Sequence, residues 1–165
     1  MRRDFSVTEL AKLVADQFLG DDVQTVQRQL QHWTERGILK TEGDLFVGRG
    51  GSRRYSLEAA YLASILVRLA AYGIPIAVLK MLTEGFETKL SEDPAAHALW
   101  EEAIAGTKRV HFGFWFVGSA NAVHQLTFVV TDGPISQEDL IVPAIWLNVT
   151  HRFSRVRAAL GRANG

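Results

Sequence analysis

The chain of 165 residues contains no cysteine, and this absence excludes several kinds of chemistry. Disulfide bridges, thiolate metal sites and iron–sulfur clusters all require cysteine, as does a thiol nucleophile. Sensing of soft metals or of oxidants through thiolates is therefore excluded for this chain.

Net charge and long apolar runs are absent as well. Eighteen Lys and Arg residues balance eighteen Asp and Glu residues, which argues against a protein that binds nucleic acid without discrimination. The longest apolar runs, such as residues 110–119, stop well short of a bilayer span, and the first residues hold no apolar signal core. We therefore expect no membrane segment and a cytoplasmic, nucleoid-associated location, with the 47% of apolar residues filling one or two small cores.

Motifs for catalysis and for metal binding are scarce. The stretch Gly48-Arg49-Gly50-Gly51 lacks the lysine and hydroxyl residue of a phosphate-binding loop. No two histidines have the four-residue spacing of a helical metal site, although His111 and His124 lie on neighbouring predicted strands and can meet across a hairpin. All five histidines fall in separate predicted elements: His32, His97, His111, His124 and His151. We predict no enzyme, no catalytic residue, no metal and no cofactor.

The first half of the chain does contain well-marked helix ends. Ser6 and Glu9 form the hydroxyl and carboxylate pair of a capping box, directly before the apolar positions of a first helix. Asp21 and Asp22 offer the next N-cap, and Gly37 supplies a left-handed stop. Between them, apolar residues recur at three- and four-residue steps: Val23, Val26, Leu30 and Trp33. A second helix is therefore predicted over this segment.

The polar face of that second helix predicts contact with DNA bases. Its side chains have the reach and the donor and acceptor pairs needed to read adenine and guanine edges in a major groove. The candidate residues are Gln24, Gln27, Arg28, Gln31 and His32. An amphipathic helix also needs a polar outer face for solvation alone, and glutamine is a good helix former, so this face does not decide the function by itself.

The segment after the helix strengthens the DNA interpretation. Residues 45–47 and 53–55 flank a glycine-rich turn, which is typical of a hairpin, and the segment has three arginines and no acidic residue. These arginines are Arg49, Arg53 and Arg54. Such a wing would lie along the phosphates and would add salt-dependent affinity rather than sequence information. A solvated basic turn is the alternative.

Two further helices complete the first half. Ser56 can cap one with a wide apolar stripe that ends before Gly73, and Ile74-Pro75 opens the next through Val78, Leu79 and Leu82. This order of parts resembles the MerR family of transcriptional regulators. The residues that carry the resemblance are Thr8-Glu9-Leu10-Ala11-Lys12-Leu13, Gly37-Ile38-Leu39, Arg53-Arg54-Tyr55-Ser56, Tyr72-Gly73-Ile74-Pro75-Ile76 and Leu79-Lys80-Met81-Leu82.

The resemblance implies a sequence-reading helix, wing contacts to the DNA backbone by Arg54 and Tyr55, and a homodimer on an inverted repeat. The chain departs from the family pattern at two places. Gln31, His32 and Trp33 stand where the family usually has an arginine and two aromatics, and residues 16–20 lack its usual short turn. The second half also lacks the family's long dimerising helix.

In the second half, residues 86–106 hold one lysine against five acidic residues, and residues 107–165 hold six basic residues against three acidic ones. A short helix is expected over 94–105, with Ala98, Leu99, Ala103 and Trp100 on its apolar side. Strands are expected over 108–117, 123–131 and 140–149, followed by a basic terminal helix that Thr150 or Ser154 helps to start.

These expectations define an α+β fold, in which a mainly helical winged helix-turn-helix precedes a small antiparallel-sheet module with a C-terminal helix. We expect the DNA-binding domain over 1–85, an acidic linker with a short helix over 86–106, and a dimerisation or sensing module over 107–165. The aromatic side chains of this module are more often core than ligand cage. A sheet edge, or the stripe Phe153, Val156 and Leu160, is expected to form the dimer.

The function predicted is that of a bacterial sequence-specific transcriptional regulator. Its expected partners are double-stranded DNA, a second copy of the chain and, as a further candidate, RNA polymerase; a small-molecule effector is not identified. Two alternatives stay open on the same scaffold. One is an excision-type or architectural protein that bends DNA, and the other is a helix-turn-helix used for protein interaction.

Overall fold

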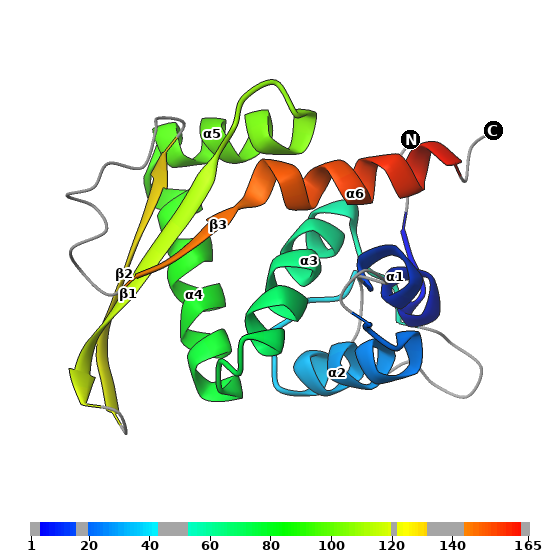
Figure 1. Ribbon diagram of the computed structural model, residues 1–165, viewed down its shortest axis with the longest axis horizontal. Coiled ribbons are helices and arrows are strands. Elements are labelled where there is room, and N and C mark those ends of the chain that lie inside the picture. The colour runs from blue at the N-terminus through cyan, green and yellow to red at the C-terminus, as the bar shows by residue number, and fades with distance from the viewer. Residues whose placement is uncertain (1–3, 16–19, 43–52, 120–121, 132–143, 163–165) are drawn as a thin grey trace. The chain divides into compact units, whose positions relative to one another are not determined.

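The computed structural model describes residues 4–15, 20–42, 53–119, 122–131 and 144–162 (Figure 1). Its contacts divide the chain into two compact units. Unit 1 comprises residues 1–75 together with 155–165, and unit 2 comprises residues 76–154. The predicted turn at 48–52 and the connection at 16–19 lie outside the described residues.

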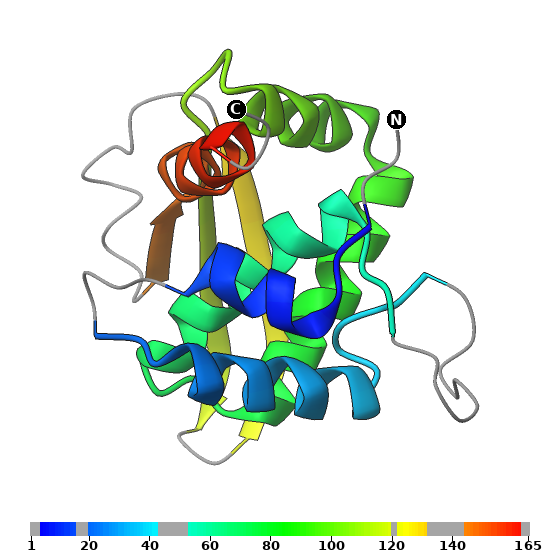
Figure 2. The same cartoon turned by 90° about the vertical axis from the view of Figure 1, so that its right-hand side faces the viewer.

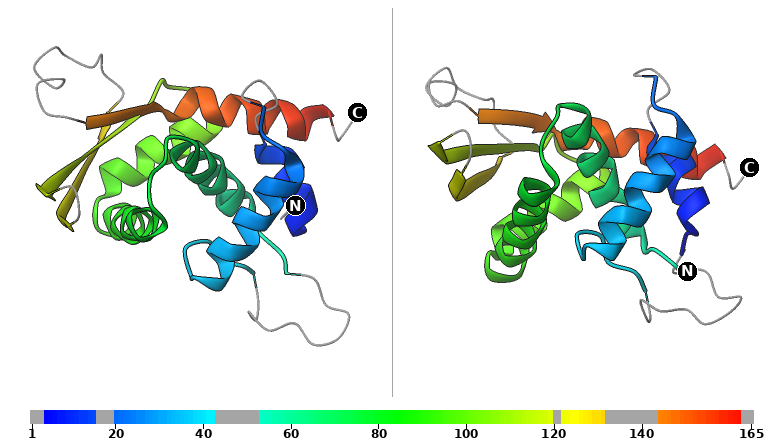
Figure 3. Two further views of the ribbon diagram at one scale, coloured as in Figure 1. Left: turned by 60° about the horizontal axis from the view of Figure 1, so that its bottom comes forward. Right: turned by 90° about the horizontal axis from the view of Figure 1, so that it is seen from below.

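Unit 1 begins with two capped helices, α1 (Val7–Val14) and α2 (Val23–Glu35), which lie side by side (Figures 2 and 3). The capping box predicted at Ser6 and Glu9 is present, and the Asp22 side chain caps α2 by accepting from the Thr25 backbone N–H at 2.9 Å. These caps satisfy backbone N–H groups that have no partner within a helix. Both predicted helix starts are confirmed.

Gly37 ends α2 as the sequence predicts. Its φ is +70°, and the Ile38 backbone N–H donates to the Trp33 carbonyl at 2.8 Å while the Gly37 N–H donates to Thr34 at 3.0 Å. This pair of bonds is a Schellman motif, which requires a left-handed residue after the helix. The chain is thereby turned so that Ile38 and Leu39 are buried directly after the helix.

Three extended segments accompany the helices of unit 1. Phe5 pairs with Tyr55, and Glu42 pairs with Arg54, both in antiparallel bridges. Residues 53–55, which we call the wing root, therefore lie between Phe5, which precedes α1, and Glu42, which follows α2. The predicted strand at 45–47 lies outside the described residues. Ser56 then caps α3 (Leu57–Ala71), as predicted.

Unit 2 contains two helices and a sheet. α4 (Ile76–Glu92) and α5 (Pro94–Ala105) precede β1 (His111–Ser119), β2 (Ala122–Thr131) and β3 (Ala144–Asn148). The strand order is β2-β1-β3, so β1 is the central strand. Both of its pairs are antiparallel. Figure 1 shows α4 alongside this sheet, and both α4 and α5 contact β2. The strands agree with those predicted to within a few residues.

The predicted acidic linker is helical. α4 runs through the boundary drawn at residue 85 as far as Glu92, and only Asp93 separates it from α5. The Asp93 side chain accepts from the Ala95 backbone N–H at 2.9 Å and caps α5, with Pro94 in the first helical position. These 21 residues are acidic because they carry the outer faces of two helices, which composition alone did not distinguish from a linker.

The core of unit 2 is aromatic. The Trp100 ring stacks on Phe112 at a centroid distance of 6.0 Å and meets Phe153 edge-on at 4.9 Å. Phe86 from α4 packs edge-on against Trp100 at 4.8 Å. On α5, Ala96 and Ala103 are buried with Trp100, whereas Ala98 is exposed. The apolar side predicted for α5 is thus partly wrong, because the large indole sets which face turns inward.

The last helix, α6 (Val149–Arg162), is joined to the start of β1 by Thr150. The Thr150 hydroxyl accepts from the Val110 backbone N–H and donates to the Lys108 carbonyl, both at 2.8 Å. The cap is instead Asn148, whose side-chain oxygen accepts from the His151 backbone N–H at 2.9 Å. The prediction that Thr150 or Ser154 starts this helix is therefore wrong.

Two further expectations are corrected in the second half. His111 pairs with Thr131 and Asn148, while His124 falls at the irregularity near Val117 and Gly118, so the two histidines sit at opposite ends of the hairpin. On α6, Phe153 and Val156 are buried within the single chain and Leu160 is half-buried. Their stripe is thus not a free face for a second copy.

The fold is α+β, as the sequence predicts. Within the described residues it consists of six helices and one antiparallel sheet, apart from the isolated bridges of unit 1. No helix in that part of the chain combines the length and the apolar character needed to cross a membrane.

Candidate nucleic-acid interface

The exposed face of α2 carries the five residues that the sequence singled out. Gln24, Arg28 and His32 are exposed, and Gln27 and Gln31 are half-buried. The other side of the helix is buried through Val26, Leu30 and Trp33. Because a helix turns once in 3.6 residues, the five polar positions form one continuous strip along its outer side.

Polar contacts at the N-terminal part of α2 involve Gln27 and the N-cap Asp22. The Thr8 hydroxyl of α1 donates to Gln27 Oε1 at 3.4 Å, so this side chain is oriented from the neighbouring helix. At the N-terminus of α2, the side-chain hydrogen bond from Thr25 lowers the pKa of Asp22, and backbone hydrogen bonds act in the same direction. The ionised form of the Asp22 carboxylate is therefore stabilised at this end of the helix.

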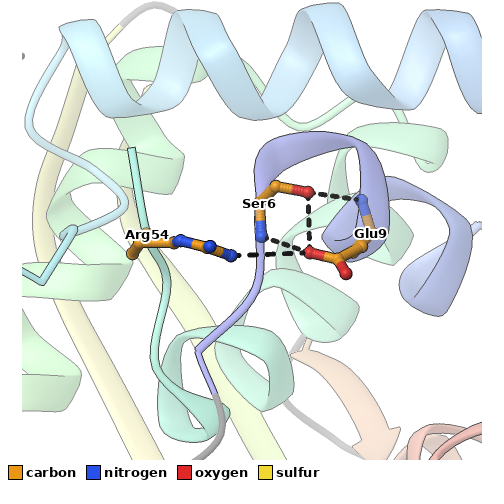
Figure 4. A network of polar contacts seen from close by, with 3 residues as sticks. All are labelled: Ser6, Glu9 and Arg54. Carbon is orange, nitrogen blue, oxygen red and sulfur yellow. Dashed lines mark hydrogen bonds and ion pairs between the residues drawn. The ribbon is translucent and has the colours of Figure 1, made fainter. Parts of the chain in front are cut away.

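The wing root adds two arginines next to the helices. Arg54 is exposed, and its Nη1 lies 3.8 Å from Glu9 Oε2 on α1 (Figure 4). Arg53 is half-buried, and its Nη1 lies 3.8 Å from Glu35 Oε1 at the end of α2. Arg49, the third arginine of the predicted wing, lies outside the described residues.

Tyr55 does not have the role that the family resemblance implies. Its side chain is 0% exposed, and its hydroxyl lies 2.9 Å from the Thr34 hydroxyl of α2, which is also 0% exposed. Thr34 has one hydroxyl proton and donates it to the Leu30 carbonyl at 2.8 Å, so Tyr55 is the donor to Thr34. With no exposed atom to offer a phosphate, Tyr55 is an internal tie between the wing root and α2.

Sequence reasoning missed this tie, although a local signal was present. Tyr55 occupies the position before the N-cap Ser56, where an apolar residue commonly packs against the fourth helical position, here the buried Ala60. Phe5 occupies the same position before Ser6 and is also buried. Thr34 has no such signal, because its partner lies 21 residues away in the chain.

Trp33 is also removed from the candidate surface. It is only 3% exposed, so the aromatic position at the end of α2 serves the core. The structure thus assembles two groups on unit 1. One is the polar strip of α2, and the other is the pair of arginines at the wing root, which Arg53 and Tyr55 connect to the C-terminal end of that helix.

The described residues contain no group of three or more histidine, aspartate or glutamate side chains that could hold a metal ion. Comparison of the sequence with protein-family models and with curated proteins found no match.

Proposed function

We propose that unit 1 binds double-stranded DNA as a MerR-like winged helix-turn-helix and that the chain is a sequence-specific transcriptional regulator. The observation that carries this proposal is the pairing of the polar strip on α2 with an arginine-bearing wing root tied to the end of the same helix. A rigid link of this kind would keep a groove-reading helix and a backbone-contacting wing in register.

In this proposal the strip and the wing root have different tasks. Gln24, Gln27, Arg28 and Gln31 read base edges from the major groove, since amides and guanidinium groups match purine edges in pairs of hydrogen bonds. His32 lies at the far end of the strip. Arg53 and Arg54 neutralise phosphates, with Arg49 as a third cation on the wing. Tyr55 has no direct contact with DNA.

The protein acts as a homodimer in this proposal, and the sheet of unit 2 supplies the interface. β2 and β3 are the outer strands of the described sheet, so each has one edge without a neighbouring strand in that sheet. Such an edge can pair with its counterpart in a second copy about a twofold axis. A location on the nucleoid in the cytoplasm and an interaction with RNA polymerase would accompany this function.

The test is selection of preferred sites from random duplexes by the purified full-length protein at near-physiological salt. An enriched inverted repeat supports a symmetric sequence-reading dimer, and its half-site spacing reports the dimer geometry. A single or directly repeated half-site would instead favour an architectural, DNA-bending protein. No enrichment and no binding would overturn the proposal.

Two sets of variants separate the proposed roles. Arg53→Ala with Arg54→Ala should weaken binding to all duplexes and flatten the salt dependence, whereas Gln27→Ala or Arg28→Ala should chiefly reduce sequence preference. The matched control is Lys80→Ala, which removes an exposed cation from α4 in unit 2. If both sets behave like wild type, α2 and the wing root are not the DNA interface.

A further inference from the structure

We infer that Glu9 and Glu35 lower the affinity of unit 1 for DNA phosphates by holding the two wing-root arginines, an inference that rests on the proposed function. Arg54 is paired with Glu9, and Arg53 with Glu35, both at 3.8 Å. The cations proposed to bind phosphate thus already have anionic neighbours, one from each of the first two helices.

Both pairs are weak enough for DNA to displace. The Glu9 and Glu35 side chains are 61% and 60% exposed, and 3.8 Å exceeds the length of a charge-assisted hydrogen bond. Exposed ion pairs of this kind change an equilibrium by about fivefold at most. A duplex that presents several phosphates can therefore recruit the arginines, with an affinity reduced by the competing carboxylates.

Of the two glutamates, Glu9 gives the clearer test, because hydrogen bonds position its carboxylate. Its Oε2 accepts from the Ser6 backbone N–H at 2.8 Å and from the Ser6 hydroxyl at 2.7 Å, in addition to facing Arg54 (Figure 4). The capping box therefore holds this negative charge beside the wing root and restricts the movement of the side chain. The same residue belongs to the capping box of α1 and places a negative charge beside Arg54.

The two carboxylates should change the affinity for the DNA backbone and not the recognition of bases. Arg53 and Arg54 carry no sequence information if they contact phosphates, so the carboxylates should reduce binding to all duplexes by a similar factor. That would restrain the sequence-independent binding that phosphate contacts supply. It fits a chain whose basic and acidic residues balance overall.

The test compares full-length wild type with Glu9→Gln and with Glu9→Gln plus Glu35→Gln on a labelled mixed-sequence duplex over a range of salt concentrations. Glutamine can fill the same capping-box position as glutamate, so the substitution removes the charge and keeps the cap. We expect about two- to fivefold tighter binding for each charge removed and a steeper salt dependence. Glu58→Gln, an exposed acid in the first turn of α3, is the matched control.

A double-mutant cycle with Arg54→Ala tests whether Glu9 acts through the arginine. The gain from Glu9→Gln should be smaller when Arg54 is absent. An equal gain in both backgrounds would be a general charge effect and would overturn the inference that Glu9 acts through Arg54. If wild type binds DNA and Glu9→Gln binds it with the same affinity, this inference is overturned and the proposed function is not. If wild type and Glu9→Gln both fail to bind any duplex at low salt, the proposed function fails and this inference fails with it.

Discussion

The hydroxyl of Tyr55 donates to the hydroxyl of Thr34 in the interior of unit 1, at 2.9 Å, and neither side chain is exposed. The direction of this bond follows from the second bond of Thr34, whose only proton goes to Leu30. The two partners are therefore not equivalent, and substitutions of them should have unequal effects.

Thr34→Val should destabilise the protein more than Tyr55→Phe. Valine keeps the shape but leaves the buried Tyr55 hydroxyl without an acceptor, which costs about 1–3 kcal/mol in the free energy of unfolding. Tyr55→Phe removes one hydrogen bond while Thr34 keeps its donation to Leu30, at a cost of about 1 kcal/mol. The double variant should lose less than the sum. Urea denaturation of the four proteins measures this cycle, and additive losses would contradict the assigned bond.

Gly37→Ala should destabilise unit 1 through the backbone alone. Gly37 has a φ of +70°, and nothing lies within 4 Å of the position of an added Cβ, so no steric clash contributes. A left-handed residue with a Cβ costs about 1 kcal/mol. Gly37→Asn should cost less, because asparagine tolerates this conformation.

Gly161→Ala is the matched control for Gly37. It also meets nothing within 4 Å, has no positive φ, and lies in α6. Alanine is the better helix former, so this substitution should leave stability unchanged or raise it slightly. Thermal unfolding of the three variants checks the contrast, and equal effects of the two alanine substitutions would contradict it.

Trp100→Ala should severely destabilise unit 2. The indole contacts Phe86, Phe112 and Phe153, which come from a different helix or strand in each case, so its removal opens a cavity among all of them. Truncation of a buried aromatic residue costs about 3–5 kcal/mol. Trp100→Phe keeps part of the packing and should cost less. Denaturation monitored by near-ultraviolet circular dichroism measures both, and an effect below about 1 kcal/mol for the alanine variant would contradict this packing.

His111 should make stability depend on pH in the mildly acidic range. Desolvation lowers the pKa of His111 below its ordinary value of 6.5, and the nearby Arg109 acts in the same direction. The unfolded chain then binds a proton that the folded chain resists, so stability from this group is present above about pH 6.5 and declines as the pH falls through the folded pKa. NMR titration of the ring measures the pKa directly, and His111→Gln should flatten the pH dependence of unfolding. A pKa at or above 6.5 would contradict this prediction.

The parts of this fold that the sequence predicted are those specified by neighbouring residues. Caps at Ser6, Asp22 and Ser56 and the stop at Gly37 depend on contacts within about five positions, and all four are present. Strand positions followed from alternation and turn residues for the same reason.

What the sequence could not predict depends on contacts between distant residues. The hydrogen bond of Tyr55 depends on Thr34, which lies 21 residues earlier, and the role of Thr150 depends on backbone groups 40 and 42 positions earlier. The separation of His111 and His124 depends on the register of the hairpin, which pairs His111 with Thr131 and leaves His124 beside the turn. The sequence identified the polar strip of α2 and the arginines of the wing root, but it did not reveal the acids that face those arginines.

Unit 1 is formed by two separate segments of the chain, which affects the order in which the protein can fold. Residues 155–165 belong with residues 1–75, and unit 2 occupies the sequence between them. During synthesis the first three helices emerge early, yet the segment that completes their unit leaves the ribosome only after all of unit 2. The first three helices contact one another, so they can start to pack before that segment is made. Its own packing into unit 1 is then a contact of high sequence separation, a kind that forms slowly.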